Sequence, residues 1–234
     1  MVNISVARNW ISDWRLYLAE FLGTLVFVFI SSSIVVSQGL LGKASVIETA
    51  FAIGLSYVAL LFATVHISGG YLNSVVTVAL WLCRRLSGSR TIFYVISQVF
   101  GSIAAAFLVL FVFGSRALEF SLGMPTVGLD IDFNTAFVME AVLSAGLVFV
   151  VYGTMVDRNG PVSFGPLALG LYVVAATLLA FGVSGAGINP ARAIGPAVVS
   201  GAGAELVIYM VGPMIGSFFG VLYEFVFLKK PKKK

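Results

Sequence analysis

The sequence predicts an all-α membrane protein in which six transmembrane helices and two short re-entrant half-helices form an inverted repeat. Hydrophobic residues make up 59% of the 234 residues and charged residues only 10%, which is more apolar than a soluble core of this size requires. Six apolar windows are long enough to cross a bilayer, and sequence patterns from the first half return in the second. We expect one domain, residues 1–234, with repeats at about 16–113 and 133–228.

The six predicted spans are windows with few or no charged residues. Each is about 20 residues long, which is the length that a helix needs to cross the hydrocarbon layer. A helix is favoured there because it satisfies its own backbone hydrogen bonds. The windows cover residues 16–36, 46–65, 92–113, 133–156, 162–183 and 206–228.

The two halves of the chain correspond at several positions. Glu20 in the first span is matched by Glu140 in the fourth, 120 residues later, and Gly54 is matched by Gly170, 116 residues later. Each half has three spans, an odd number, so the second half must enter the membrane from the opposite face. Inverted repeats of this kind place their functional site near the bilayer midplane. We expect close helix crossings at a set of glycines: Gly23, Gly54, Gly101, Gly170 and Gly216.

Two short segments predict what fills the midplane. Residues 74–81 and 190–199 are apolar but too short to span, and each follows a glycine-containing link that ends in an asparagine. Asn189 stands where a helix N-cap belongs, and Pro190 takes the first helical position. We expect the links at 68–72 and 184–188 to line a wet cavity, because non-helical backbone is tolerated at membrane depth only in such places.

The two half-helices predict how such a cavity would select its permeant. If they meet tip to tip, both positive dipole ends point at the centre of the membrane and repel cations and protons. A neutral molecule that accepts hydrogen bonds from the side-chain amides of Asn73 and Asn189 would pass. The sequence therefore predicts a pore through the lipid bilayer that passes small neutral molecules.

Lysine and arginine counts predict the orientation in the membrane. Under the six-span topology, 11 of them fall on the face that holds both termini and only two, Lys43 and Arg116, on the other. The positive-inside rule makes the termini cytoplasmic, and we expect the plasma membrane as the location. The net charge of +4 then reflects a membrane surface, and no nucleic-acid partner is indicated. The 11 residues are Arg8, Arg15, Arg84, Arg85, Arg90, Arg158, Lys229, Lys230, Lys232, Lys233 and Lys234.

The composition gives no support for an enzyme. The chain has one histidine, His66, and one cysteine, Cys83, and it contains no phosphate-binding glycine motif. One histidine cannot supply a multi-histidine metal site, and no serine, histidine and aspartate set is indicated. We therefore expect no catalytic residue, metal or cofactor.

The motifs together resemble the aquaporins of the major intrinsic protein family, over essentially the whole chain. The residues that carry the resemblance are 19–24 (Ala-Glu-Phe-Leu-Gly-Thr), 66–70 (His-Ile-Ser-Gly-Gly), 187–192 (Gly-Ile-Asn-Pro-Ala-Arg) and 209–213 (Tyr-Met-Val-Gly-Pro). The resemblance implies an hourglass-shaped monomer with its own pore, assembled as a homotetramer. One departure is the first Asn-Pro-Ala box, which reads Asn73-Ser74-Val75; we expect its half-helix to form with a less rigid start.

The resemblance also implies a four-residue selectivity filter at Ile53, Thr177, Ala186 and Arg192. Strict water channels typically carry Phe and His at the first two positions, so the smaller Ile and Thr predict a wider and less polar constriction. That constriction would admit water first, and also small uncharged solutes such as glycerol, urea or hydrogen peroxide. Ala193 and Ala197, however, do not match the acidic and basic residues of glycerol channels.

Three further residues have roles that the resemblance implies. Glu20 and Glu140 would accept hydrogen bonds from the re-entrant links and hold their shape, with a proton relay as the alternative. His66 would line the cytoplasmic half of the pore, either as a fixed wall residue or as a pH sensor.

Three other functions remain open at this point. The chain could be a glycerol-class solute facilitator with minor water flux. It could be a secondary transporter, because inverted repeats and broken helices serve that class too, although Glu20 and Glu140 are its only candidate coupling carboxylates. It could also be a non-conducting structural or adhesive membrane protein.

Overall fold

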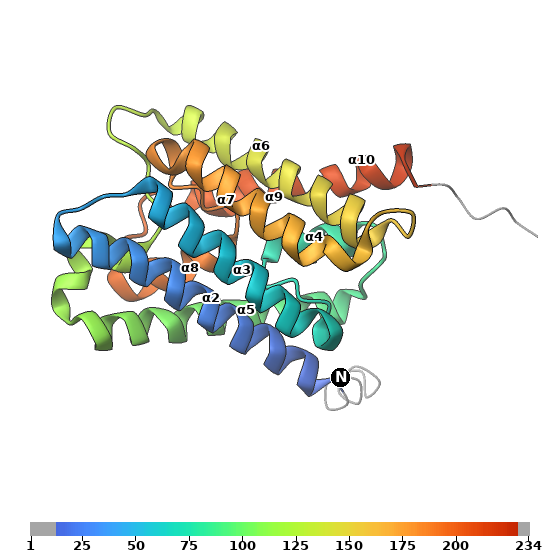
Figure 1. Cartoon of the computed structure of the whole chain (residues 1–234), viewed down its shortest axis with the longest axis horizontal. Helices are drawn as coiled ribbons and strands as arrows, with labels where there is room; N and C mark the ends of the chain where they lie inside the picture. The colour runs from blue at the N-terminus through green and yellow to red at the C-terminus, as the bar shows by residue number, and fades with distance from the viewer. Residues whose placement is uncertain (1–12, 229–234) are drawn as a thin grey trace, which may run out of the picture.

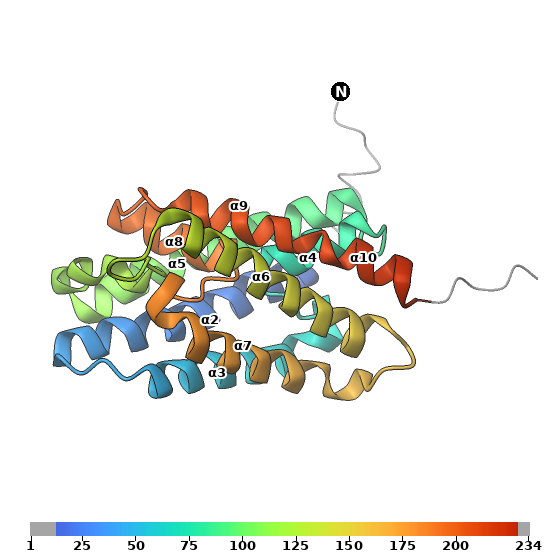
Figure 2. The same ribbon diagram turned by 90° about the horizontal axis from the view of Figure 1, so that it is seen from above.

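The computed structural model describes residues 13–228, and the regular secondary structure of this part of the chain is helical, with no strand. The helices run roughly along the long axis of the molecule, and α2 begins at the same end of the bundle at which α10 ends (Figures 1 and 2). In chain order the elements are α2 (Trp14–Leu41), α3 (Val46–Ser68), α4 (Ser74–Leu82), α5 (Gly88–Phe113), η1 (Ser115–Gly123), α6 (Phe133–Val151), η2 (Tyr152–Val156), η3 (Val162–Phe164), α7 (Gly165–Ser184), α8 (Pro190–Ser200), α9 (Leu206–Ser217) and α10 (Phe219–Val226).

The six predicted membrane spans are confirmed as helices of sufficient length and apolarity. The first extends further than predicted, from Trp14 to Leu41, and the last is divided into α9 and α10 at Phe218. The fourth span ends in a short π-helical segment, η2. Arg8 and the lysines at 229–234, which contribute to the predicted orientation, lie outside the described residues.

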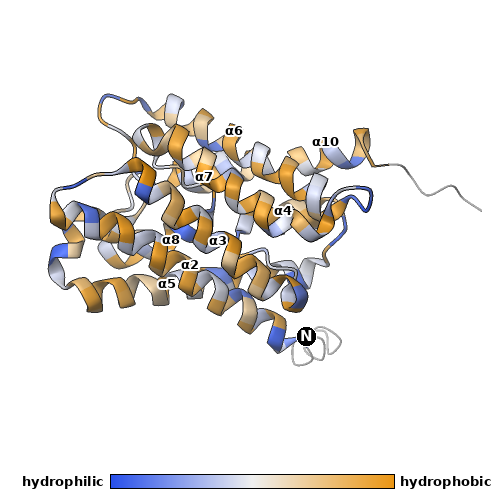
Figure 3. Ribbon diagram, in the orientation of Figure 1, coloured by the Kyte–Doolittle hydropathy of each residue, from blue (hydrophilic) through white to orange (hydrophobic). Residues whose placement is uncertain are grey.

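The outer surface of the bundle is apolar along most of its length, and polar residues gather at the loops (Figure 3). Large hydrophobic side chains such as Phe100, Phe111 and Leu179 are exposed on this surface. In water such a surface would drive aggregation, whereas in a bilayer it contacts lipid tails. The distribution is that of an integral, multi-pass membrane protein.

Three helix pairs form the frame of the bundle. α2 packs on α5, α6 packs on α9 in the corresponding way, and α3 packs on α7 between the two halves. At the α3–α7 crossing, a Cβ atom added to Gly54 would lie 2.6 Å from the carbonyl oxygen of Gly170, and one added to Gly170 would lie 2.6 Å from that of Gly54. Gly101 and Gly216 lie equally close to the backbones of α2 and α6, so these four glycines permit the predicted close crossings. Gly23 instead faces the side chain of Leu72.

The half-helices α4 and α8 complete the interior. They lie in opposite halves of the bundle's length, as expected if they enter from opposite ends (Figures 1 and 2). Each packs against a helix of the other repeat, α8 on α5 and α4 on α9. Because each half-helix packs against the other repeat, the links that precede α4 and α8 meet inside the molecule.

Candidate functional site

Two asparagines begin the half-helices. Both have extended backbone, with φ of −149° at Asn73 and −148° at Asn189. The Oδ1 atom of Asn73 accepts a hydrogen bond from the Val75 amide at 2.8 Å, and that of Asn189 accepts one from the Ala191 amide at 3.1 Å. Each side chain therefore caps its own helix, and its NH2 group must point away from that helix.

Each NH2 group donates a hydrogen bond to a carbonyl oxygen of the opposite link, across the centre of the molecule. Nδ2 of Asn73 donates to the carbonyl oxygen of Ile188 at 3.0 Å, and Nδ2 of Asn189 donates to that of Leu72 at 2.8 Å. These reciprocal bonds hold the two N-terminal helix ends tip to tip. They also engage one N–H of each amide, so only the second N–H remains for the predicted contact with a permeant.

The links before the asparagines have an unusual backbone. Leu72 and Ile188 both have positive φ, 48° and 41°, and so does Ala186, at 49°. Side chains with a Cβ atom rarely adopt this conformation, which costs on the order of 1–3 kcal/mol per residue unless the surroundings impose it.

Two buried carboxylates impose that conformation. Glu20 accepts hydrogen bonds from the Ser68 hydroxyl at 2.6 Å and from the Tyr71 and Leu72 amides at 3.1 and 2.8 Å. In the second half, Glu140 accepts them from the Ser184 hydroxyl at 2.6 Å, the Gly187 amide at 2.8 Å and the Ile188 amide at 2.6 Å. Each carboxylate thus satisfies the three donors that its link would otherwise bury unpaired.

The first half has an additional network where the first box departs from the family pattern. The Ser74 hydroxyl donates to Oε1 of Gln98 at 3.0 Å, and Nε2 of Gln98 donates to Glu20 at 2.8 Å and to the Thr77 hydroxyl at 3.0 Å. The Ser74 amide, which a proline would lack, donates to Oδ1 of Asn189 at 3.4 Å. Gln98 lies 24 residues after Ser74 and outside every motif, so nothing in the sequence marks it as part of the site.

A narrow central cavity joins the asparagines to most of the predicted filter. Its volume of about 10 Å³ is close to the smallest that holds one water molecule. Thr177 is not among the residues that line this cavity. Val173, one turn earlier on α7, lines it instead. The lining residues are Phe27, Ile53, Tyr57, Asn73, Val173, Ala186, Gly187, Ile188, Asn189 and Arg192. Phe27, Tyr57 and Val173 are lining residues that the sequence analysis missed.

Arg192 is buried beside this cavity, with 2% of its surface exposed. Its Nη1 atom donates to the carbonyl oxygen of Ala186 at 2.8 Å, whereas its Nε atom has no hydrogen-bond partner within residues 13–228. The hydroxyl of Thr177 is also buried and unpartnered in this part of the chain. Because Arg192 lines the cavity, a small polar molecule there can accept a hydrogen bond from its Nε atom.

His66 lies apart from these groups. It is exposed near the end of α3, it does not line the central cavity, and the described part of the chain offers its side chain no hydrogen bond. The link residue Tyr71 is nearer to the site, because its amide binds Glu20 and its carbonyl oxygen binds the Tyr57 hydroxyl.

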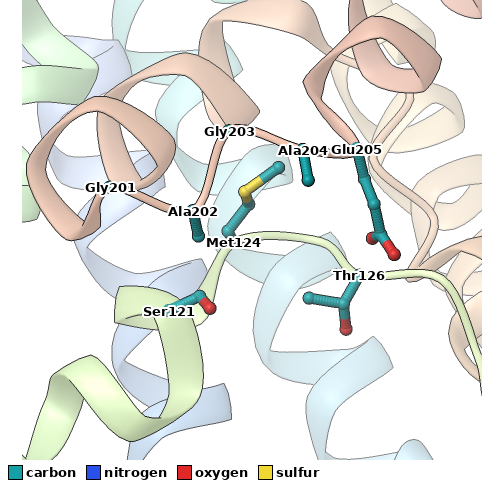
Figure 4. Close-up of a pocket in the computed structure, with 8 residues that line it drawn as sticks. All are labelled: Ser121, Met124, Thr126, Gly201, Ala202, Gly203, Ala204 and Glu205. Atoms are coloured by element: carbon teal, nitrogen blue, oxygen red, sulfur yellow. The ribbon is translucent and has the colours of Figure 1, made fainter.

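A second hollow, of about 290 Å³, opens between η1 and the link from α8 to α9 (Figure 4). The carboxylate of Glu205 points toward the chain at Thr126, and it accepts a hydrogen bond from the Val127 amide at 3.0 Å. This hollow shares no lining residue with the central cavity. The contact ties the segment after η1 to the start of α9.

The geometry defines a class of protein: a helical membrane channel whose two half-helices meet at a narrow central cavity. Comparison with known proteins agrees with that class. The sequence model of the major intrinsic protein family matches residues 7–224. The chain is 37% identical to "Probable aquaporin TIP4-1" of Oryza sativa subsp. japonica, over 92% of this chain and 88% of that relative. It is 33% identical to "Aquaporin-4" of Bos taurus, over 92% of this chain and 68% of that relative.

A solved structure has the same fold. The X-ray structure of the aquaglyceroporin from Plasmodium falciparum superposes with a TM-score of 0.78 at 23% identity, covering 92% of this chain and 96% of that one. The chain belongs to the major intrinsic protein family. It is a passive transmembrane channel for water and small solutes, and it is not an enzyme.

Proposed function

We propose that water crosses this protein one molecule at a time through the central cavity between the half-helices, and that Asn73 and Asn189 orient it there. The observation that carries the proposal is the pair of reciprocal bonds between each asparagine and the opposite link. They fix both amides beside a cavity that is wide enough for about one water molecule. The second N–H of each amide is then available as a donor to that water.

Charge exclusion follows from the same arrangement. Two helix N-termini directed at one point create a positive potential, and the guanidinium of Arg192 adds a full charge beside the cavity. We assign Glu20 and Glu140 to supporting the links, because their oxygens already receive three or more donors each. Carboxylates engaged in this way make poor ion-coupling groups, which argues against the secondary transporter.

We assign the selectivity filter to Ile53, Thr177, Ala186 and Arg192. Three of the four line the cavity, and Thr177 lies one turn after the lining residue Val173 on α7. With such small side chains, the filter by itself would admit water and also glycerol, urea or hydrogen peroxide. His66 remains our prediction for a wall residue of the cytoplasmic half, at a more exposed position than the filter residues.

The proposed function comes with a proposed domain organisation, membrane orientation and oligomeric state. We propose a single domain, residues 1–234, built from repeats at about 16–113 and 133–228, with both termini in the cytoplasm and the plasma membrane as its location. We further propose a homotetramer in which each chain carries its own pore. The many exposed hydrophobic side chains of the bundle are compatible with both lipid and neighbouring copies.

Vesicle swelling tests the proposed path. Vesicles that contain the purified protein should shrink much faster than empty vesicles under a sucrose gradient, and the flux should rise linearly with the gradient. Ile53→Trp should reduce that water flux strongly, because it adds a large ring to a cavity of about 10 Å³. Saturating flux that follows a proton gradient would favour the transporter, and shrinkage no faster than in empty vesicles would favour a structural protein.

A further inference from the structure

Tyr57 is a cavity residue that neither the asparagine motifs nor the filter pattern includes. It lies four residues after Ile53, one turn further along α3, and only 1% of its surface is exposed. It lines the same cavity as Asn73, Asn189 and Arg192. A tyrosine is considerably larger than any of the four filter residues except Arg192, so it occupies space that the small filter residues leave open.

Two contacts hold the Tyr57 ring in place. Its hydroxyl donates to the carbonyl oxygen of Tyr71 at 2.8 Å, and its ring packs against Phe27 with the centroids 4.9 Å apart. Tyr71 is itself fixed, because its amide donates to the buried carboxylate of Glu20 at 3.1 Å. The ring is therefore tethered to α2 by packing and to the link before Asn73 by a hydrogen bond. A side chain fixed at both ends cannot swing aside for a larger permeant without losing these contacts.

We propose that Tyr57, seated against Phe27, is the residue that limits solute size in this channel. It admits water and excludes glycerol and urea, even though the filter at Ile53 and Thr177 is small. This inference rests on the proposed path through the central cavity. The size limit then lies on α3, at the level of the asparagines. The filter residues alone would predict a broader permeability, which the Tyr57 ring prevents.

The test compares solute fluxes for variants at Tyr57. In the wild-type protein, vesicles should show rapid water flux and glycerol and urea fluxes close to those of empty vesicles. Tyr57→Val should raise the glycerol and urea permeabilities at least about tenfold, because removing the ring lowers a steric barrier, while water flux changes less. Tyr57→Phe should keep glycerol excluded, because the ring remains. Phe27→Ala offers a second route, because it frees the Tyr57 ring to move away from the cavity.

Tyr94 supplies a matched control. It is also 1% exposed, and its hydroxyl also donates to a link carbonyl, that of Ser68, at 2.8 Å, but it does not line the cavity. Tyr94→Val, compared with Tyr57→Val, should leave the glycerol and urea fluxes at the wild-type level. Size-exclusion chromatography of each variant in detergent separates a change in selectivity from a loss of folding.

Each remaining outcome has a defined meaning. Rapid glycerol flux through the wild-type protein would overturn the inference. So would unchanged glycerol exclusion in folded Tyr57→Val and Phe27→Ala, provided that Ile53→Trp still reduces water flux. If Ile53→Trp leaves water flux unchanged as well, the proposed path through the cavity has failed, and the inference about Tyr57 fails with it.

Discussion

At the scale of single residues, the channel depends on two carboxylates that enforce a costly backbone. Leu72 and Ile188 would not adopt positive φ in a free chain, yet both do so here with their amides bound to Glu20 and Glu140. The strained links in turn place Asn73 and Asn189 at the centre. Strain at a functional position is tolerated because the surrounding hydrogen bonds determine the conformation.

Glu140→Ala should destabilise the second link strongly. The change leaves the Ser184 hydroxyl and the Gly187 and Ile188 amides buried without their acceptor, at about 1–3 kcal/mol each. We expect a markedly lower melting temperature in detergent and loss of water flux.

Glu224→Ala is the control for Glu140→Ala. It removes a carboxylate that pairs with Arg85 at 2.7 Å on the surface, where the two side chains are 35% and 37% exposed. Such exposed pairs contribute only about 0–1 kcal/mol. Equal melting temperatures for the two variants would show that Glu140 does not support the link.

Ser74→Pro should lower stability although it restores the proline of the usual box. Proline fits the first turn of a helix, but it removes both the Ser74 amide bond to Asn189 and the hydroxyl bond to Gln98. The Oε1 atom of Gln98 then stays buried without a donor, at a cost of about 1–3 kcal/mol. Thermal unfolding of Ser74→Pro and Ser74→Ala measures this, and a more stable proline variant would contradict the role given to the Gln98 network.

At the scale of the helices, the two repeats are joined where α3 crosses α7. The crossing is close because neither Gly54 nor Gly170 carries a Cβ atom, and one added to either would lie 2.6 Å from the carbonyl oxygen of the other. This contact positions the cavity wall, since Ile53 and Tyr57 belong to α3 and Val173 to α7. Spreading the helices at this point would therefore change the pore as well as the packing.

Gly170→Ala should destabilise the protein and alter its flux. The new Cβ atom would lie 2.6 Å from the carbonyl oxygen of Gly54 and would clash with a methyl group of Val58, so the helices must separate. Gly182→Ala in the same helix has no atom within 4 Å of the new Cβ and should be neutral or stabilising by up to about 1 kcal/mol. Melting curves and water flux compare the two, and similar behaviour would show that the crossing tolerates a wider spacing.

At the scale of the whole molecule, the inverted repeat determines which groups share a face of the membrane. Among the described residues, Arg84, Arg85 and Arg158 lie in loops at the end where α2 begins, whereas Lys43 lies in a loop and Arg116 in η1 at the opposite end. The bias in short links is the one that sets orientation during insertion.

Thiol labelling in intact cells tests that orientation. Cys83 is the only cysteine in the chain and is partly exposed at the end of α4, on the predicted cytoplasmic side. A membrane-impermeant thiol reagent should leave the wild-type protein unlabelled until the cells are permeabilised. In a Cys83→Ser background, Lys43→Cys should be labelled from outside. The reverse pattern would mean that the termini face the exterior.

Much of the site could be predicted because the chain contains each part twice. Asn73 and Asn189 precede short apolar segments, and the resemblance to the aquaporins implied that Glu20 and Glu140 accept hydrogen bonds from the links. Tyr57, Phe27 and Val173 could not be identified in this way. They belong to helices that are apolar on all sides, so no periodic pattern indicates which face is turned to the cavity.

The sequence by itself determined the six spans, the two half-helices and the family. These features depend on local properties, namely the length of apolar segments and the need to satisfy backbone hydrogen bonds within hydrocarbon. Only the tertiary structure decided which side chains narrow the cavity and where the asparagine amides bind. Those contacts join residues such as Asn73 and Ile188, 115 positions apart, and depend on how the helices rotate and cross.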